Sequence, residues 1–130
     1  AVADWHVASA SRSKIKKQNS TLPVLEFAEN PDILATVSHM TSQRPDLVIG
    51  FAAETDDVLA NATAKRTRKG CDWVVANDVS PETGIMGGSE NAVTLISAEG
   101  ADSWPRMGKA QVADALADRM ARYFAAGKDA

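Results

Sequence analysis

Short apolar runs alternate with helix-like segments in the middle of the chain, and this order constrains the fold most strongly. Residues 47–53 form a near-continuous apolar run, and residues 73–76 form another. Such runs are typical of parallel strands that are buried on both faces. The segment between them has Thr55 near its start and Gly70 at its end. This pattern predicts a helix that Thr55 caps and Gly70 terminates.

The flanking sequence continues the same alternation. Asn30 is expected to cap a second helix, because Pro31 suits the first helical position and Asp32 suits the positive end of the helix dipole. Other expected elements are strands at residues 1–7, 22–28 and 92–97 and a final helix at residues 108–126. The order predicts an α/β fold with a Rossmann-like parallel sheet flanked by helices. Because the first strand starts at residue 1, the N-terminal part of the domain is expected to be missing, and residues 1–130 to be one partial domain.

Composition narrows the class of protein. The single cysteine, Cys71, excludes an internal disulfide framework and favours a cytoplasmic location. No apolar run approaches the roughly 20 residues that span a bilayer, and the net charge of −3 argues against nucleic acid as a partner. Two basic clusters favour a small polyanion instead: Arg12, Lys14, Lys16 and Lys17, and Lys65, Arg66, Arg68 and Lys69.

Polar residues at the predicted strand ends are the first site candidates, because ligands of parallel sheets bind beyond the carboxyl ends of the strands. Asp4 could cap a turn, or hold a ribose hydroxyl or Mg²⁺. Phe51 could belong to the core or stack on a nucleobase. Asn77 and Asp78 could form a turn or line the site. These residues converge if their strands are neighbours.

The lysines admit two interpretations each. Lys14 lies in a polar loop, where it is either solvated or part of a lid that closes over phosphates. Lys65 and Lys69 share one helix face, where like charges repel unless an anion lies between them, although a helix C-terminus also attracts cations. Cys71 is expected to be a small buried residue. The sequence has no glycine-rich phosphate-loop motif and no dinucleotide fingerprint.

Several sequence segments, taken in order, resemble phosphopantothenoylcysteine synthetase, the C-terminal domain of a bifunctional coenzyme A flavoprotein. The segments are Ala-Val-Ala-Asp at 1–4, Lys-Ile-Lys-Lys at 14–17, Asn-Pro-Asp-Ile-Leu at 30–34, Gly-Phe-Ala-Ala-Glu-Thr at 50–55, Lys65, Lys69, Asn-Asp-Val-Ser at 77–80, Asn91 and Lys109. The set covers nearly the whole chain. Trp5 and residues 85–88 depart from the family pattern, so the role of the loop at residues 84–88 is open.

The resemblance implies that CTP activates the carboxylate of 4'-phosphopantothenate as an acyl-cytidylate, which the amine of cysteine then attacks. It implies Lys14 as the catalytic lysine, Asp4 as a Mg²⁺ ligand, and Ala1 and Asn77 as substrate contacts. The implied nucleotide contacts are Ala1, Val2, Ala3, Asp4, Lys14, Pro31, Asp32, Ile33, Leu34, Phe51, Lys65 and Lys69. It also implies a homodimer in the intact enzyme, with FMN only on a decarboxylase domain that this sequence does not contain. The 130 residues alone are expected to be inactive.

Two other functions fit parts of the sequence. A non-catalytic nucleotide-binding or assembly module would use the same fold and basic clusters without chemistry. A dehydrogenase would share the fold but would need a dinucleotide fingerprint. The set of lysines favours the synthetase over both.

Overall fold

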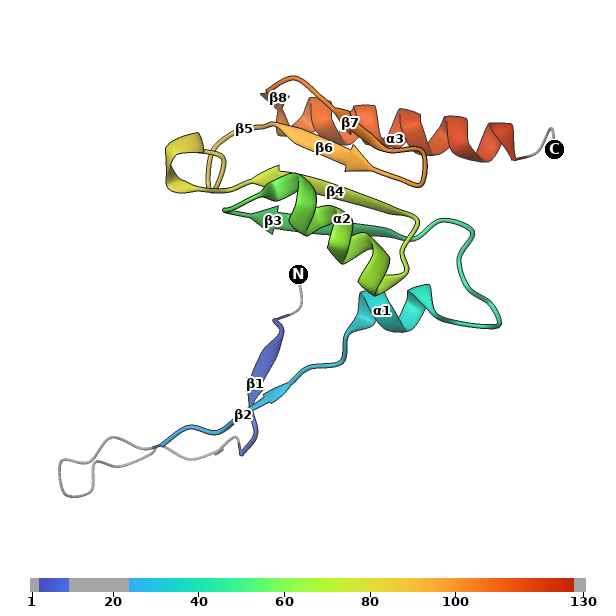
Figure 1. The fold of residues 1–130 in the computed structure, drawn as a ribbon. Coiled ribbons are helices and arrows are strands. Elements are labelled where there is room, and N and C mark those ends of the chain that lie inside the picture. Colours follow the sequence, from blue (N-terminus) through green and yellow to red (C-terminus); the bar gives the residue numbers. More distant parts are fainter. Residues whose placement is uncertain (1–2, 10–23, 128–130) are drawn as a thin grey trace.

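A central sheet with helices on both faces forms the body of the protein (Figure 1). The computed structural model describes residues 3–9 and 24–127. The sheet has the strand order β3-β4-β6-β7. Its members are β3 (Ile49–Glu54), β4 (Trp73–Asp78), β6 (Val93–Ile96) and β7 (Ala101–Ser103). This arrangement confirms the predicted α/β class, in which a sheet that contains parallel strands is flanked by helices.

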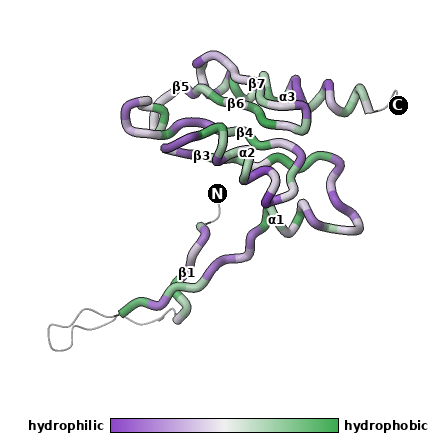
Figure 2. The backbone as a smooth tube through the Cα atoms, viewed as in Figure 1, coloured by the Kyte–Doolittle hydropathy of each residue, from purple (hydrophilic) through white to green (hydrophobic). Residues whose placement is uncertain are grey.

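Alternate residues of β4 divide the core into two layers. Val74 and Ala76 pack with Ala62 of α2 (Val58–Lys69), and α1 (Ile33–Ser38) adds Leu34 to this layer. On the other face, the cluster that contains Trp73 and Val75 is covered by α3 (Lys109–Ala126) through Val112, Leu116 and Met120. Because side chains of a strand point alternately to opposite faces, a strand covered on both sides must be apolar throughout. Figure 2 shows the hydrophobic stretches of β4 and β6 in green.

The parallel arrangement holds for only one pair of the central strands. β3 and β4 are parallel and joined by α2, as predicted, with Ile49 opposite Trp73 and Glu54 opposite Asp78. The predicted parallel placement of the strand near residues 92–97 is wrong, since β6 runs antiparallel to β4 and β7 runs antiparallel to β6. A parallel return requires a long crossover, usually a helix. The segment after β4 contains only the short 3-10 helix η1 (Pro81–Thr83) and β5 (Glu90–Asn91), so the chain reverses direction.

The first strand also differs from its prediction. β1 (Trp5–Val7) pairs antiparallel with β2 (Phe27–Glu29) in a separate two-stranded ribbon. In Figure 1 this ribbon projects away from the central sheet. The expectation that residues 1–7 form a strand of the main sheet is therefore wrong for the described residues 3–7. The strand expected at residues 22–28 begins later and is shorter.

Two helix starts lie later than predicted. Asp32, rather than Asn30, is the N-cap of α1, and its carboxylate accepts a hydrogen bond from Ala35 N at 3.0 Å. Asp57, rather than Thr55, precedes α2, and its φ of 37° places it in the left-handed region. The predicted end at Gly70 is confirmed, with a φ of 70° that glycine adopts without strain.

A second two-stranded ribbon follows β4 in the chain. β5 pairs antiparallel with β8 (Met107–Gly108), directly before α3. Cys71 is buried, as expected, and burial raises the pKa of its thiol. Among the described residues, no helix combines the length and the apolar character needed to span a membrane.

Candidate functional site

The carboxyl ends of β3 and β4 lie side by side, as predicted. Ala53 is opposite Asn77 in the ladder, and the next pair is Glu54 and Asp78. The Asn77 side chain donates a hydrogen bond from Nδ2 to Asn91 Oδ1 at 3.1 Å. Asp4 does not join these ends, because it lies next to the β1–β2 ribbon. The predicted convergence therefore holds for two strand ends and not for the third.

The Asp78 side chain stabilises the turn that follows β4. Its Oδ1 accepts hydrogen bonds from Ser80 N at 2.8 Å and from Ser80 Oγ at 2.5 Å. These bonds favour the ionised carboxylate and lower the pKa of Asp78. Of the two interpretations of this residue, the structure supports the turn.

Lys65 is held against the backbone of β3. Its ammonium donates to the carbonyl oxygen of Phe51 at 2.9 Å. The Phe51 side chain is 65% exposed, so it is not part of the core. An exposed aromatic ring can receive a flat ring system by stacking.

Lys69 lies one helical turn further along α2 and has a charged partner. Its ammonium forms a hydrogen-bonded ion pair with Asp32 Oδ2. The hydrogen bond from Lys69, followed by the one from Ala35 N, lowers the pKa of Asp32. Each lysine therefore has an internal hydrogen-bond acceptor, and only Lys69 has an anion as its partner.

Close packing joins α1 to β3. A Cβ atom added to Gly50 would lie 2.7 Å from Leu34 Cδ2, which shows how tightly Leu34 covers this glycine. Leu34 is half-buried, while Pro31 and Ile33 beside it are exposed. The packing places the start of α1 next to the strand that carries Phe51.

Asn30 links the same region to the first residues of the chain. Its side-chain Nδ2 donates to Ala3 O at 2.6 Å, and its backbone N donates to Asp4 O at 2.8 Å. Ala3 and Asp4 thus adjoin the segment that leads into α1. Ala1, Val2 and Lys14 lie outside the described residues, and their predicted roles stay predictions.

These contacts define a surface along the outer edge of β3, which we call the lysine surface. Its members are Asp32, Leu34, Lys65 and Lys69. Leu34 packs over Gly50 and side chains alternate along a strand, so the ring of Phe51 points to the opposite face of the sheet at the same edge, and only its carbonyl oxygen contacts Lys65. Lys69 precedes the amino end of β4, whereas Asn77 lies at the carboxyl end of that strand. The structure therefore brings four of the twelve predicted nucleotide contacts together on this surface, and it places Asn77 at the other end of β4.

Asp4 fits a metal only in combination with a ligand. Among residues 3–9 and 24–127, no three His, Cys, Asp or Glu side chains gather into a group that could hold a metal ion. Mg²⁺ is commonly held by one or two carboxylates together with substrate phosphates. The exposed carboxylate of Asp4 suits a Mg²⁺ ion that arrives on a nucleotide.

Comparison with known proteins decides the family. Residues 1–124 match the sequence model of the DNA/pantothenate metabolism flavoprotein C-terminal domain. The chain belongs to this family. It is 42% identical over 118 residues to the coenzyme A biosynthesis bifunctional protein CoaBC of Vibrio cholerae, a match that covers 89% of this chain and 29% of the relative. Identity to the CoaBC protein of Escherichia coli K12 is 38% over 126 residues, covering 95% of this chain and 31% of the relative.

Solved structures agree with this family. The crystal structure of the C-terminal domain of a coenzyme A biosynthesis bifunctional protein CoaBC superposes with a TM-score of 0.62 at 30% identity, covering 81% of this chain and 47% of that chain. The DNA/pantothenate metabolism flavoprotein from Streptococcus pneumoniae superposes with a TM-score of 0.58 at 19% identity, covering 78% of this chain and 44% of that one, and supports the fold alone. The chain thus spans less than a third of these two curated relatives and about half of these structures.

The contacts of two residues in this flavoprotein-family domain were not predicted from the sequence. Asn30 is not the cap of α1, and its side chain ties Ala3 to the segment that leads into α1. Arg106 holds the loop at residues 84–88, because it donates to Thr83 O at 2.8 Å and pairs with Glu90 at 3.0 Å. The partners of Arg106 lie 16 and 23 residues away in the sequence, so no local sequence pattern predicts these contacts.

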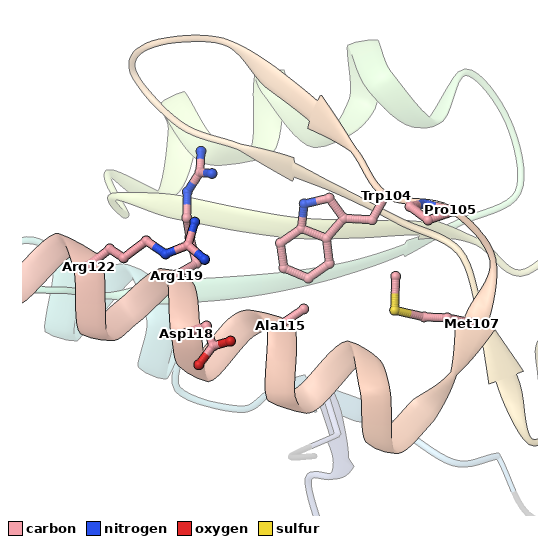
Figure 3. Close-up of a pocket in the computed structure, with 7 residues that line it drawn as sticks. All are labelled: Trp104, Pro105, Met107, Ala115, Asp118, Arg119 and Arg122. Carbon is pink, nitrogen blue, oxygen red and sulfur yellow. The ribbon is translucent and has the colours of Figure 1, made fainter.

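Hollows in the described part of the surface also lie elsewhere. Two adjoining hollows, of about 290 and 370 Å³, lie where α3 faces the β6–β7 hairpin. Both are lined by Arg119 and Arg122, and Figure 3 shows these arginines on α3 together with the ring of Trp104. No predicted site residue lines either hollow. A search for these hollows alone would therefore not find the lysine surface.

Proposed function

We propose that the chain carries the nucleotide-binding part of a phosphopantothenate–cysteine ligase in coenzyme A biosynthesis. In the first step a carboxylate oxygen of 4'-phosphopantothenate attacks the α-phosphorus of CTP. A P–O bond forms, pyrophosphate leaves, and an acyl-cytidylate results. In the second step the amine nitrogen of cysteine attacks the acyl carbon, a C–N bond forms, a proton leaves the amine, and CMP departs.

One observation carries this proposal: four side chains that the family resemblance assigns to the nucleotide lie on one surface. They are Asp32, Leu34, Lys65 and Lys69, which are separated by up to 37 residues in the sequence. Leu34 packs on Gly50, and Lys65 binds the carbonyl of Phe51, whose exposed ring lies at the same strand edge. A strand edge with two ammonium groups and an exposed aromatic ring suits a base with a phosphate chain.

The proposed roles follow from position and charge. Phe51 stacks on the cytosine ring, with Pro31, Ile33 and Leu34 as the wall beside it. Lys65 and Lys69 bind the phosphate chain and offset the negative charge that builds up as pyrophosphate leaves. Mg²⁺, when bound, would neutralise phosphate charge, and Asp4 is the residue proposed to hold it.

The remaining roles rest on the family resemblance. Lys14 acts as the catalytic lysine of a lid. Ala1, Val2 and Ala3 line the nucleotide through their backbone. Ala1 and Asn77 contact phosphopantothenate, and Asn91 holds the Asn77 amide in place by the 3.1 Å hydrogen bond.

We further propose that these 130 residues bind CTP but do not complete the ligation alone, since they span less than a third of the two curated relatives compared. The active form is a cytoplasmic homodimer, and FMN belongs to a decarboxylase domain outside this sequence. An exposed ribbon that carries Trp5 and Phe27 is consistent with an interface between protomers.

A chimera tests the proposal. Residues 1–124 replace the matching segment of the Escherichia coli relative, and pyrophosphate release is measured with CTP and phosphopantothenate before cysteine is added. We expect release with the chimera, loss of release with its Lys14→Ala variant, and none with the 130 residues alone. A folded chimera that binds CTP and releases no pyrophosphate would instead support a nucleotide-binding or assembly module.

A further inference from the structure

The two lysines of the lysine surface differ in what they contact without a nucleotide. Lys65 donates to a neutral carbonyl oxygen, that of Phe51. Lys69 is engaged by the carboxylate of Asp32. The Lys69 side chain is 22% exposed and the Asp32 side chain 44% exposed. An anion approaching Lys69 from solvent therefore meets the carboxylate at the same position.

Asp32 is held where it competes well for the ammonium. Its Oδ1 accepts a hydrogen bond from Ala35 N as the cap of α1, while Oδ2 faces Lys69. The Leu34–Gly50 packing fixes α1 against β3. A group tethered in this way acts as an intramolecular ligand with a high effective concentration. The hydrogen bond from Lys69 also lowers the pKa of Asp32, so the carboxylate is ionised at neutral pH.

We propose that Asp32 is a tethered competitor for Lys69 that weakens the binding of every phosphate ligand using this lysine, and thereby favours the release of the product nucleotide. Its carboxylate occupies Lys69 in the place of a phosphate oxygen, so an incoming phosphate must displace it. The cost of breaking the Asp32–Lys69 pair is the same for a triphosphate and for a monophosphate that takes Lys69. Both therefore bind more weakly than they would to an unpaired lysine. The inference rests on the proposed function, in which CTP enters and CMP leaves.

The Asp32→Asn variant isolates this effect. Asparagine caps helices as well as aspartate does, so α1 keeps its cap while the competing charge is removed. Binding of CTP and CMP to the 130-residue chain is measured by calorimetry at low salt without added divalent metal. Because exposed ion pairs are worth little, we expect CMP to bind about fivefold more tightly to the variant. The affinity for CTP should rise by a similar factor, because CTP displaces the same carboxylate.

Three further measurements make the comparison specific. Asp114→Asn removes an exposed carboxylate from α3 and should leave both affinities unchanged. In a Lys69→Gln background, Asp32→Asn should no longer tighten CMP binding, because the two residues act through one contact. Asp32→Ser also keeps a capping oxygen and repeats the test if the asparagine variant fails to fold.

Inorganic tripolyphosphate and orthophosphate separate this inference from the proposed function. They carry the phosphate charge without the base, so Asp32→Asn should tighten the binding of both even if cytosine is not recognised. If orthophosphate and CMP bind Asp32→Asn no more tightly than the wild type, the competition does not exist. Failure of both proteins to bind tripolyphosphate at millimolar concentration would overturn the inference as well.

Discussion

The contact between Gly50 and Leu34 allows the packing of α1 on β3 to be tested quantitatively. In Gly50→Ala the new Cβ would lie 2.7 Å from Leu34 Cδ2 and 3.5 Å from Cys71 Sγ. Unstrained carbon atoms approach to roughly 3.5–4.0 Å, so Leu34 is about 1 Å too close. Overpacking costs about 1–3 kcal/mol, and we expect about 1–2 kcal/mol here because the atom that must move ends a half-buried side chain.

A double-mutant cycle separates this clash from other effects. Leu34→Ala alone should cost about 1–2 kcal/mol, less than a fully buried leucine would. It also makes room for the new methyl group, so the double variant should be more stable than the sum of the single losses predicts, by about 1 kcal/mol.

Urea denaturation measures all three variants. Gly127→Ala is the control, because Gly127 has a φ of −73° and a Cβ there would meet only Tyr123 O, at 3.7 Å. It should be neutral or stabilising, by up to about 1 kcal/mol. If Gly50→Ala is as stable as the wild type, or if the two losses are additive, then Leu34 does not restrict this glycine and the reasoning fails.

Three further predictions concern stability. Asp72→Ala leaves Val48 N and the Arg44 guanidinium without the carboxylate oxygen that accepts from them at 2.7 and 2.9 Å, and urea denaturation should show a loss of about 1–3 kcal/mol; an unchanged midpoint would contradict this. Leu95→Ala, at a side chain only 1% exposed, should lower the free energy of unfolding by about 2–5 kcal/mol, and equal losses for half-exposed Leu59→Ala would refute the assignment of the core. The pKa of Asp32 lies below its ordinary 3.8 in the folded state, so its contribution is present above pH 4 and is lost as pH falls through the folded value; Asp32→Asn should therefore lose less stability than the wild type between pH 5 and pH 2.

The fold was predictable where sequence and structure depend on neighbouring residues. The apolar runs at β3 and β4 and the glycine after α2 mark a local β-α-β unit, and that unit is present. The reversal into β6 was not predictable from the apolar run at residues 92–97, because strand direction depends on the connection and not on the strand. The two misplaced caps have a similar cause, since several adjacent residues at each start can cap a helix, and tertiary contacts select one.

In the candidate site, too, local features were predictable from the sequence and long-range contacts were not. The spacing of Lys65 and Lys69 placed them on one face of α2 correctly. Their acceptors lie 14 and 37 residues away, so the Phe51 carbonyl and the Asp32 carboxylate could not be inferred from the helix itself. The idea that an anion must relieve the repulsion between the lysines was sound in part, because the chain supplies one anion itself.

The outer edge of β3 has a consequence for amide hydrogen exchange. Val48 and Glu54 accept hydrogen bonds from Trp73 N and Val79 N, so the even-numbered residues of this parallel strand bond to β4. Among the described residues β3 has no other neighbour, and the amides of Ile49, Phe51 and Ala53 therefore face outward. Deuterium should enter this strand in an alternating pattern, with protection at residues 50, 52 and 54 and rapid labelling between them. A ligand or partner that pairs with this edge would be recognised by the disappearance of that alternation.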